Sequence, residues 1–319
     1  MRAITDFVRA TSLPEALKEE LAGSVIMQQH ALYVHLPTWL APLFGPAVSP
    51  AQVEQLSFCS YYYFRFLLVV DHVLDAPAPA NGAANGAANG AGAAAAPQAA
   101  TVRLLTYCDL FERSVRGLSA LFPAGDPFWA QLDACKKQYA ASNHHEKQLN
   151  ARRGPFSLEA FEALAAGKSA VCNAIVYALS SLGGTAEPVN VLLECLRHTH
   201  VALQCMDDVE DFRTDSEQGQ YTYAHAQVEA YLAAEGLDPA AMTPALVHPY
   251  LYTSGTADAL YALGQEHFKR AIGLAKALGL KELTELLVHH VLRCGFYRTD
   301  IAAKIDTAHQ RAALAAVAA

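Results

Sequence analysis

The sequence Leu203-Gln-Cys-Met-Asp-Asp-Val-Glu-Asp-Phe-Arg-Thr-Asp215 ends an apolar, helix-forming segment that begins near Val189. Asp207, Asp211 and Asp215 are spaced four residues apart. On a helix they follow roughly one face over about 12 Å and drift about 40° per step. Like charges at this spacing repel each other, so a purely structural helix has little use for three of them. The segment therefore predicts a cation against this face, although a solvated acidic helix end has the same pattern.

A second pair of carboxylates ends another apolar run, Phe66-Leu-Leu-Val-Val-Asp71-His-Val-Leu-Asp75. Burying unpaired carboxylates costs free energy unless a cation or a proton compensates the charge. Carboxylate oxygens suit Mg²⁺, which commonly bridges them to substrate phosphates. Two such helices predict the facing walls of one cavity with metal between them. Capping or surface aspartates are the alternative interpretation.

The composition favours a folded protein and disfavours several classes of function. Hydrophobic residues make up 53% of the 319 residues and charged residues 17%, which is typical of an extensive core. The net charge of −8 gives no electrostatic support for nucleic-acid binding. The seven cysteines form no Cys-x-x-Cys pair, which is typical of reduced thiols in a cytosolic protein. We therefore expect a cytoplasmic protein without stable membrane insertion, since the apolar stretches are short or interrupted.

Helical periodicity covers most of the chain, and no segment alternates as a β-strand does. The punctuation by Gly and Pro predicts helices over residues 14–30, 50–75, 101–121, 127–151, 157–182, 187–216, 223–235, 255–279 and 280–315. Residues 76–100 are rich in Ala, Gly, Pro and Asn and predict a flexible loop. The expectation is an all-α fold and a single domain over residues 1–319.

Both acidic motifs resemble those of the class I isoprenoid synthases. Gln204-Cys-Met-Asp207-Asp208-Val-Glu-Asp211 is similar to the second Asp-rich motif of the trans-prenyltransferases, and it also satisfies the Asp-x-x-Glu-Asp form of the squalene and phytoene synthases. Asp71-His-Val-Leu-Asp75 occupies the position of the first motif, with His72 where prenyl elongases usually carry a second Asp. Asp-x-x-x-Asp is also close to the first motif of the head-to-head synthases.

The resemblance implies a large helical bundle around a central cavity that binds a prenyl diphosphate. It also implies Mg²⁺ as the cofactor, in a cluster of up to three ions, with Mn²⁺ as a substitute, and it allows a homodimer. The metal ligands it implies are Asp71, Asp75, Asp207, Asp208, Asp211 and Asp215. The expected catalytic residues are Asp71, Asp75, Asp207, Asp208, Asp211 and Lys168.

Lys168 supplies the expected positive charge for the diphosphate. Gly167-Lys168-Ser169 resembles the Gly-Lys-Thr/Ser element of the trans-prenyltransferases, whose Lys contacts diphosphate. A Lys that reaches along an apolar helix to solvent is the alternative. Arg298 and Arg65 are further candidates for diphosphate binding.

The hydrocarbon pocket is expected next to the two motifs. Tyr63, Phe64 and Leu67 precede the first motif and are expected to share its face, while His200, Leu203 and Gln204 precede the second. Ordinary core packing is the alternative for the aromatic residues. Aromatic faces stabilise the carbocation that an allylic diphosphate leaves on ionisation.

The branch of the superfamily depends on elements outside these motifs. Chain elongases carry a Gly-Lys-x-x-Arg-Pro element near the N-terminus and an Arg-Arg-Gly just after the first motif, and this sequence has neither. We therefore expect a terpene synthase-like enzyme that ionises one prenyl diphosphate, releases pyrophosphate and forms a hydrocarbon or alcohol. The alternatives are a head-to-head synthase, then a chain-elongating synthase, then a catalytically silent relative.

Overall fold

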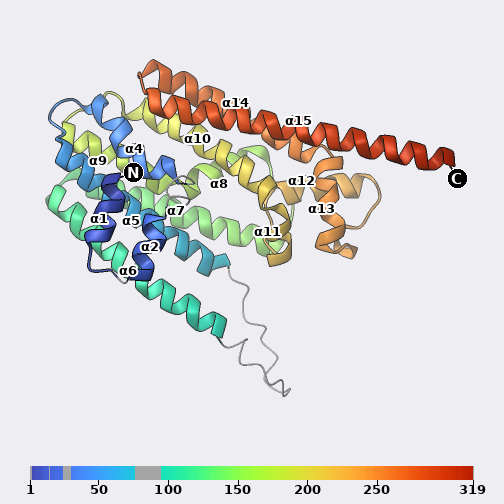
Figure 1. Cartoon of the computed structure of the whole chain (residues 1–319), viewed down its shortest axis with the longest axis horizontal. Helices are drawn as coiled ribbons and strands as arrows, with labels where there is room; N and C mark the ends of the chain where they lie inside the picture. The colour runs from blue at the N-terminus through green and yellow to red at the C-terminus, as the bar shows by residue number, and fades with distance from the viewer. Residues whose placement is uncertain (1, 14, 24–29, 76–94, 319) are drawn as a thin grey trace. The chain divides into compact units, whose positions relative to one another are not determined.

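The computed structural model describes residues 2–13, 15–23, 30–75 and 95–318 (Figure 1). Every regular element within these ranges is a helix. The prediction of an all-α fold is therefore confirmed.

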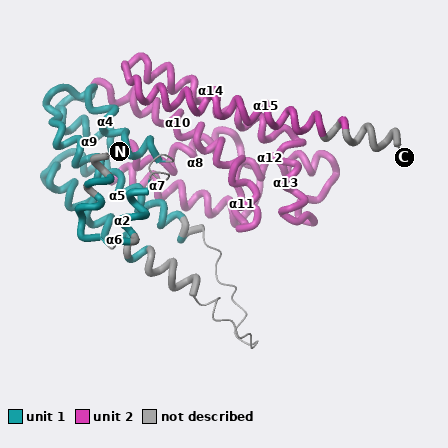
Figure 2. The backbone as a smooth tube through the Cα atoms, viewed as in Figure 1, with its two compact units in different colours: residues 1–132, 174–186 teal, residues 133–173, 187–319 magenta. Residues whose placement is uncertain are grey.

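The chain divides into two compact units (Figure 2). The first contains residues 1–132 and 174–186, and the second contains residues 133–173 and 187–319. The acidic motif at Asp71 and Asp75 belongs to the first unit, and the motif at Asp207 to Asp215 belongs to the second. The single domain expected over residues 1–319 stays a prediction.

The first unit is organised around α5, which packs against α4 and α6. Ser49 and Gln52 start α5 with reciprocal hydrogen bonds, 2.9 Å from the Ser49 N–H to Gln52 Oε1 and 3.3 Å from the Gln52 N–H to Ser49 Oγ. The helices of this unit are α1 (Arg2–Ala10), α2 (Glu15–Ala22), α4 (Ala31–Leu40), η1 (Ala41–Phe44), α5 (Pro50–Asp75), α6 (Ala95–Leu121), the start of α7 (Pro127–Arg152), and α9 (Asn173–Gly183).

Helix α6 begins earlier than the sequence predicts. Residues 95–100 are helical and were expected in the loop, whose remaining residues 76–94 lie outside the described ranges. The run Ala-Ala-Pro-Gln-Ala-Ala explains the difference, since Ala is the strongest helix former and Pro is tolerated in a first turn. Over these six residues, the low-complexity sequence has the composition of a helix and not of a flexible loop.

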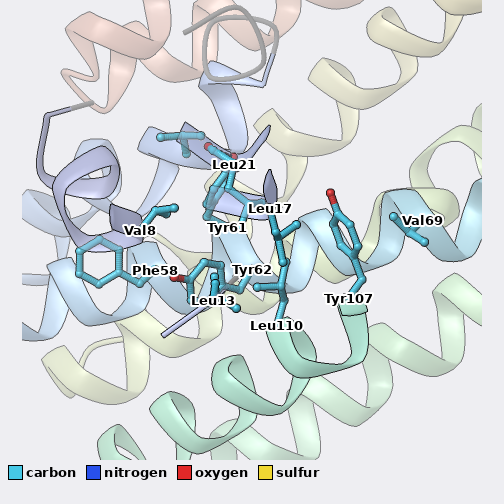
Figure 3. Packing of buried hydrophobic residues seen from close by; sticks show 11 residues of the cluster. Val8, Leu13, Leu17, Leu21, Phe58, Tyr61, Tyr62, Val69, Tyr107 and Leu110 are labelled. Atoms are coloured by element: carbon cyan, nitrogen blue, oxygen red, sulfur yellow. Dashed lines mark hydrogen bonds between the residues drawn. The ribbon is translucent and has the colours of Figure 1, made fainter. Parts of the chain in front are cut away.

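Buried aromatic residues hold α2 against α5 and α6 (Figure 3). The Tyr61 hydroxyl donates a 2.7 Å hydrogen bond to the carbonyl of Leu21. Tyr61 and Tyr107 are fully buried, and Leu17 and Leu110 pack in the same cluster. Burial of such side chains contributes about 1.5–3 kcal/mol each. This cluster fixes the helix that ends in the first acidic motif.

The second unit is built on α10, which packs against α14, and α14 in turn packs against α15. Gly264 of α14 faces α10, since a Cβ there would lie 3.4 Å from both the Ala202 carbonyl oxygen and Cys205 Cβ. The elements of this unit are the rest of α7, α8 (Leu158–Lys168), η2 (Ala170–Cys172), α10 (Val189–Glu210), α11 (Phe212–Gln218), α12 (Tyr223–Ala234), η3 (Pro239–Ala241), α13 (Pro244–Thr253), α14 (Thr256–Ala277) and α15 (Lys281–Ala318).

Two predicted helices are interrupted in the structure, and three described α-helices, α1, α4 and α13, were not predicted. The segment 157–182 breaks after Lys168, and the segment 187–216 breaks at Asp211. Helix α13 lies in a segment for which no helix was predicted, and it contains Pro249. Among the described helices, none is long and apolar enough to span a membrane alone, and only Leu158–Lys168 taken together with Ala170–Gly183 meets that test.

The glycine before Lys168 has a packing role. A Cβ at Gly167 would lie 1.9 Å from Ser142 Oγ and 2.9 Å from Ser142 Cβ on α7. Real Cβ contacts are longer than this, so α8 approaches α7 this closely only with a glycine at this position. Gly167 thereby places the end of α8, and Lys168 with it, beside α7.

We predict that Gly167→Ala lowers the free energy of unfolding by up to about 2 kcal/mol. The overlap with Ser142 costs roughly 1–3 kcal/mol, which exceeds the roughly 1 kcal/mol gained in helix propensity. Gly273→Ala in α14 is the matched control, because a Cβ there meets nothing within 4 Å and the same propensity gain should stabilise the protein. Urea unfolding followed by circular dichroism measures both. Equal effects of the two substitutions would contradict the close packing of α8 on α7.

Candidate functional site

The second acidic motif continues the helical hydrogen-bond ladder across the end of α10. The Asp211 N–H donates to the Asp207 carbonyl at 2.8 Å, and the Asp215 N–H donates to the Asp211 carbonyl at 2.8 Å. The predicted i,i+4 relationship of these three residues therefore holds through the junction of α10 and α11. Asp207 and Asp211 are exposed, and Asp215 is half-buried.

The charges of this motif are poorly compensated by the protein alone. Dense surrounding protein, followed by the charges of Asp211 and Asp208, raises the pKa of Asp207 to about 7, even though the side chain reaches solvent. Burial also raises the pKa of Asp211. A raised carboxyl pKa means that ionising the group costs free energy in the folded state. A cation at this position would remove that cost.

Asp208 is engaged inside the protein and has a structural role. Its side chain is 2% exposed. Oδ1 accepts a 2.8 Å hydrogen bond from Gln204 Nε2, and Oδ2 accepts a 3.3 Å hydrogen bond from the N–H of Ala224 in the first turn of α12. Burial raises the pKa of Asp208 to about 6, while these two hydrogen bonds lower it. The expected metal ligand Asp208 and the expected pocket residue Gln204 thus tie α10 to the N-terminus of α12.

Glu210 also forms an ion pair with a residue of a neighbouring helix. Arg293 Nη2 on α15 lies 2.7 and 2.6 Å from the two carboxylate oxygens of Glu210. Burial raises the pKa of Glu210, and Arg293 opposes the shift. Within the motif, only Asp207 and Asp211 therefore present exposed carboxylates that form no hydrogen bond with a side chain of the described residues.

Lys168 is the last residue of α8 and is held by a carboxylate that the sequence motifs did not reveal. Its Nζ lies 2.8 Å from Oε1 of Glu146 on α7, and both side chains are largely buried. The charge of Lys168 lowers the pKa of both Asp207 and Asp208, which places this cation in the electrostatic field of the acidic motif. Glu146 lies in an unremarkable helical segment, so no sequence signal pointed to it.

The two candidate arginines are engaged elsewhere. Arg65 is 5% exposed, and its Nη2 donates to Glu20 Oε1 at 2.7 Å and to the Tyr107 hydroxyl at 2.9 Å within the first unit. Arg298 forms a two-point ion pair with Asp258, with distances of 2.7 and 3.1 Å. Each arginine thus has a carboxylate partner, Glu20 for Arg65 and Asp258 for Arg298, and the expectation that they bind diphosphate stays a prediction.

The first acidic motif is described only in part. Asp71 is half-buried near the end of α5, whereas the side chain of Asp75 lies outside the described residues. The prediction that the two motifs face one cavity stays a prediction.

The expected pocket residues do not all share one environment. Tyr63 is 9% exposed and packs against Phe111 of α6 with ring centroids 5.5 Å apart, whereas Phe64 stacks on Tyr33 of α4 at 4.0 Å. Neighbouring residues on a helix point about 100° apart, so these two side chains reach different helices. The shared face expected for Tyr63 and Phe64 is therefore wrong, and Tyr63 is a core residue.

The remaining pocket candidates differ in exposure. Leu67 on α5 and Leu203 on α10 are half-buried. His200 is buried, and burial lowers its pKa to about 4, so its imidazole is neutral at pH 7.

The arrangement suits a metal ion that takes two carboxylates from the protein and completes its coordination with the oxygens of a bound anion. Among the described residues, no group of three or more His, Cys, Asp or Glu side chains converges to hold a metal ion. Mg²⁺ commonly takes only one or two carboxylates, with water and substrate phosphates completing its octahedron. Asp207 and Asp211 fit that requirement.

Comparison with known proteins places the fold. No family model and no curated protein matches the chain. Three solved structures resemble it over most of their length. A polyprenyl synthase from Caulobacter crescentus, complexed with calcium and isoprenyl diphosphate, has a TM-score of 0.65 at 17% identity and covers 91% of this chain and 92% of its own. A geranylgeranyl pyrophosphate synthase from Lactobacillus brevis has a TM-score of 0.64 at 18% identity, covering 90% and 95%. An octaprenyl pyrophosphate synthase from Helicobacter pylori has a TM-score of 0.58 at 12% identity, covering 87% and 97%.

We predict opposite effects on stability for two neighbouring aspartates in metal-free buffer. Asp207→Asn should raise Tm by about 1–3 °C at pH 8, because it removes a poorly compensated charge. The gain in Tm should fall to zero near pH 4. The carboxyl of Asp207 ionises near its ordinary pKa of 3.8 in the unfolded state and near 7 in the folded state. The free-energy cost of holding this charge in the folded protein therefore grows as the pH rises from about 4 to about 7.

Asp208→Ala is the matched comparison for this experiment. It leaves Gln204 and the N–H of Ala224 without their acceptor, which costs roughly 1–3 kcal/mol, so Tm should fall. Thermal unfolding between pH 4 and pH 8 measures both variants. A fall in Tm for Asp207→Asn at pH 8 would contradict the assignment of Asp207 as a poorly compensated carboxylate.

Proposed function

We propose that the chain is a divalent-metal-dependent prenyltransferase that ionises an allylic prenyl diphosphate and transfers its prenyl group. The observation that carries the proposal is the exposed pair Asp207 and Asp211 beside Lys168, at the end of a helix that is otherwise in the core. The fold supports it, because a polyprenyl synthase, a geranylgeranyl pyrophosphate synthase and an octaprenyl pyrophosphate synthase share this fold.

Asp207 and Asp211 are the proposed ligands of Mg²⁺ in the second unit, with Asp215 one further turn along. Asp71 and Asp75 are the proposed ligands in the first. Their carboxylate oxygens are the donors that Mg²⁺ and Mn²⁺ prefer, and a cluster of up to three ions is compatible with this number of carboxylates. When bound, these ions neutralise the negative charge that develops on the departing pyrophosphate.

Lys168 is the proposed protein donor to the diphosphate. Glu146 holds its ammonium group in one direction, so less conformational entropy is lost when an anion binds. Asp208 and Glu210 keep the end of α10 in place through α12 and α15 and do not contact the substrate.

Leu203, on α10 in the second unit, is proposed to contact the hydrocarbon chain of the substrate, and Phe64 and Leu67 of the first unit stay candidates for the same role. Apolar and aromatic side chains exclude the water that would quench a carbocation. His200 is neutral, and it adds no positive charge that would oppose the cation.

The structural neighbours change the order of the candidate reactions. Chain elongation becomes the first candidate, since the neighbours are a polyprenyl synthase and synthases of geranylgeranyl and octaprenyl pyrophosphate. A terpene synthase-like reaction on one prenyl diphosphate is the second candidate, because the sequence lacks both basic elements that elongases use for isopentenyl diphosphate. The head-to-head alternative loses support, because the Glu of Asp-x-x-Glu-Asp is paired with Arg293.

Product analysis tests the proposal. The protein is incubated with Mg²⁺ and geranyl, farnesyl or geranylgeranyl diphosphate, with and without isopentenyl diphosphate. Longer prenyl diphosphates that form only when isopentenyl diphosphate is present would support elongation. A hydrocarbon or alcohol that forms without it would support the second candidate. Failure to release pyrophosphate from any of these substrates would contradict the proposed function.

We predict that Lys168→Met lowers the rate of pyrophosphate release about 100-fold. One preorganised donor to a developing anion contributes on the order of 10²–10³ in rate. Lys136→Met is the matched control, because Lys136 lies on the exposed side of α7 in an i,i+3 ion pair with Asp133. Its rate should stay within about twofold of the wild type. A wild-type rate in Lys168→Met would remove Lys168 from the site.

A further inference from the structure

A cavity of about 670 Å³ lies within the second unit, where α13, α14 and α15 meet the end of α10 (Figure 1). Its volume is in the range of sites that bind small molecules. Apolar side chains form part of its lining, among them Val209, Ile301 and Ile305. Three helices each add a tyrosine to the lining, Tyr252 of α13, Tyr261 of α14 and Tyr297 of α15. Such a lining is typical of a site for a largely apolar ligand.

One cation of the protein already uses the chemistry of this cavity. Glu210 lines the cavity, and its carboxylate lies 2.6 Å from Arg293 Nη2. The guanidinium carbon of Arg293 lies 5.6 Å from the ring centroid of Tyr297. The face of a tyrosine ring attracts a cation, and a carboxylate adds to the attraction. A carboxylate and a tyrosine of the lining thus form a cation site, which the protein fills itself.

A second carboxylate and tyrosine of the lining have a weaker occupant. Lys304 Nζ lies 2.7 Å from Oδ2 of Asp300, and the two side chains are 75% and 40% exposed. The hydrogen bond and ion pair with Asp300 raise the pKa of Lys304, and Tyr252 raises it further, so this ammonium lies in the field of both groups. Exposed ion pairs one helical turn apart contribute little to stability, so Lys304 can be displaced at little cost.

We propose that this cavity binds an amphipathic organic cation, an ammonium ion that carries an apolar chain. The ammonium group takes the place of Lys304 Nζ beside Asp300 and Tyr252. The apolar chain enters the cavity along Val209, Ile301 and Ile305, the first two of which are buried. The proposal is independent of the proposed function, because none of these residues is assigned there to metal, diphosphate or prenyl binding.

Charge favours a cation over an anion of the same shape. The lining carries two carboxylates and one lysine, and the whole chain has a net charge of −8. The faces of tyrosine rings are electronegative, so they disfavour an anion. An anion would have to separate Lys304 from Asp300 and then lie against Tyr252. A neutral ligand would gain the apolar contacts alone.

Isothermal titration calorimetry of the full chain at low salt tests the class of ligand. The probes are octyltrimethylammonium, octanoate and 1-octanol, which have chains of similar length and carry a positive charge, a negative charge and no charge. Octyltrimethylammonium should bind once per chain with a dissociation constant on the order of 100 μM. Octanoate and 1-octanol should bind at least about tenfold more weakly. Binding of either as tight as that of octyltrimethylammonium would contradict the proposed class.

A matched pair of substitutions on α13 tests the position of the cation. Tyr252→Leu keeps an apolar side chain but removes the ring, so the dissociation constant of octyltrimethylammonium should rise about fivefold to tenfold. Tyr250→Leu is the control, because Tyr250 lies on the same helix, is also half-buried and lies outside the lining. It should bind within about twofold of the wild type.

The exposed ion pair distinguishes a cation from an anion as the ligand. Lys304→Gln frees Asp300, so octyltrimethylammonium should bind about threefold more tightly, whereas a site for anions would lose affinity. Asp300→Asn should weaken binding about threefold to tenfold at low salt. Both side chains reach solvent, so folding is retained, and circular dichroism checks this. Absence of octyltrimethylammonium binding at about 5 mM, equal effects of Tyr252→Leu and Tyr250→Leu, or weaker binding in Lys304→Gln would overturn the proposal.

Discussion

The confinement of Asp207 by surrounding protein, next to the charge of Asp211, is the constraint on which the candidate site depends. Dense surrounding protein raises the cost of ionising Asp207, and the neighbouring charges of Asp211 and Asp208 add to it, so its pKa lies near 7. The long, buried helix α10 keeps both groups at its end, where their separation cannot relax. This helix end therefore holds charge that a divalent cation would compensate, and under the proposed function the stability given up here becomes affinity for metal and diphosphate.

The rest of the motif shows how such a helix end is held in place. Asp208 contacts the first turn of α12, and Glu210 pairs with Arg293 on α15, so each carboxylate beside the repelling pair fastens α10 to a different helix. Lys168 approaches from α8, where Gly167 allows tight packing on α7 and Glu146 directs the ammonium group. Some acidic residues of the motif are thus proposed metal ligands, and the others hold the end of α10 in place.

The sequence predicts most of the helices and the acidic face, and it does not predict which side chains from distant helices contact each other. The i,i+4 spacing of Asp207 and Asp211 depends only on helix geometry, so it survives the break at Asp211. Contacts with α12 and α15 decide which carboxylates of the motif have a partner in the protein. These helices are distant in the sequence, so helical periodicity cannot reveal the contacts. For the same reason Arg65 could be placed on its helix but not matched with Glu20 and Tyr107, and Glu146 had no motif to mark it.

The most direct measurement is the binding of inorganic pyrophosphate by isothermal titration calorimetry, with and without Mg²⁺. The account predicts binding that requires Mg²⁺ and that weakens at least about 100-fold in the variant Asp207→Asn with Asp211→Asn, because these carboxylates share the metal with the anion. The variant Asp208→Asn, which retains the shape of the contact with α12, should bind within about tenfold of the wild type. Pyrophosphate binding that is equally tight without metal, or in the Asp207 and Asp211 variant, would contradict the account.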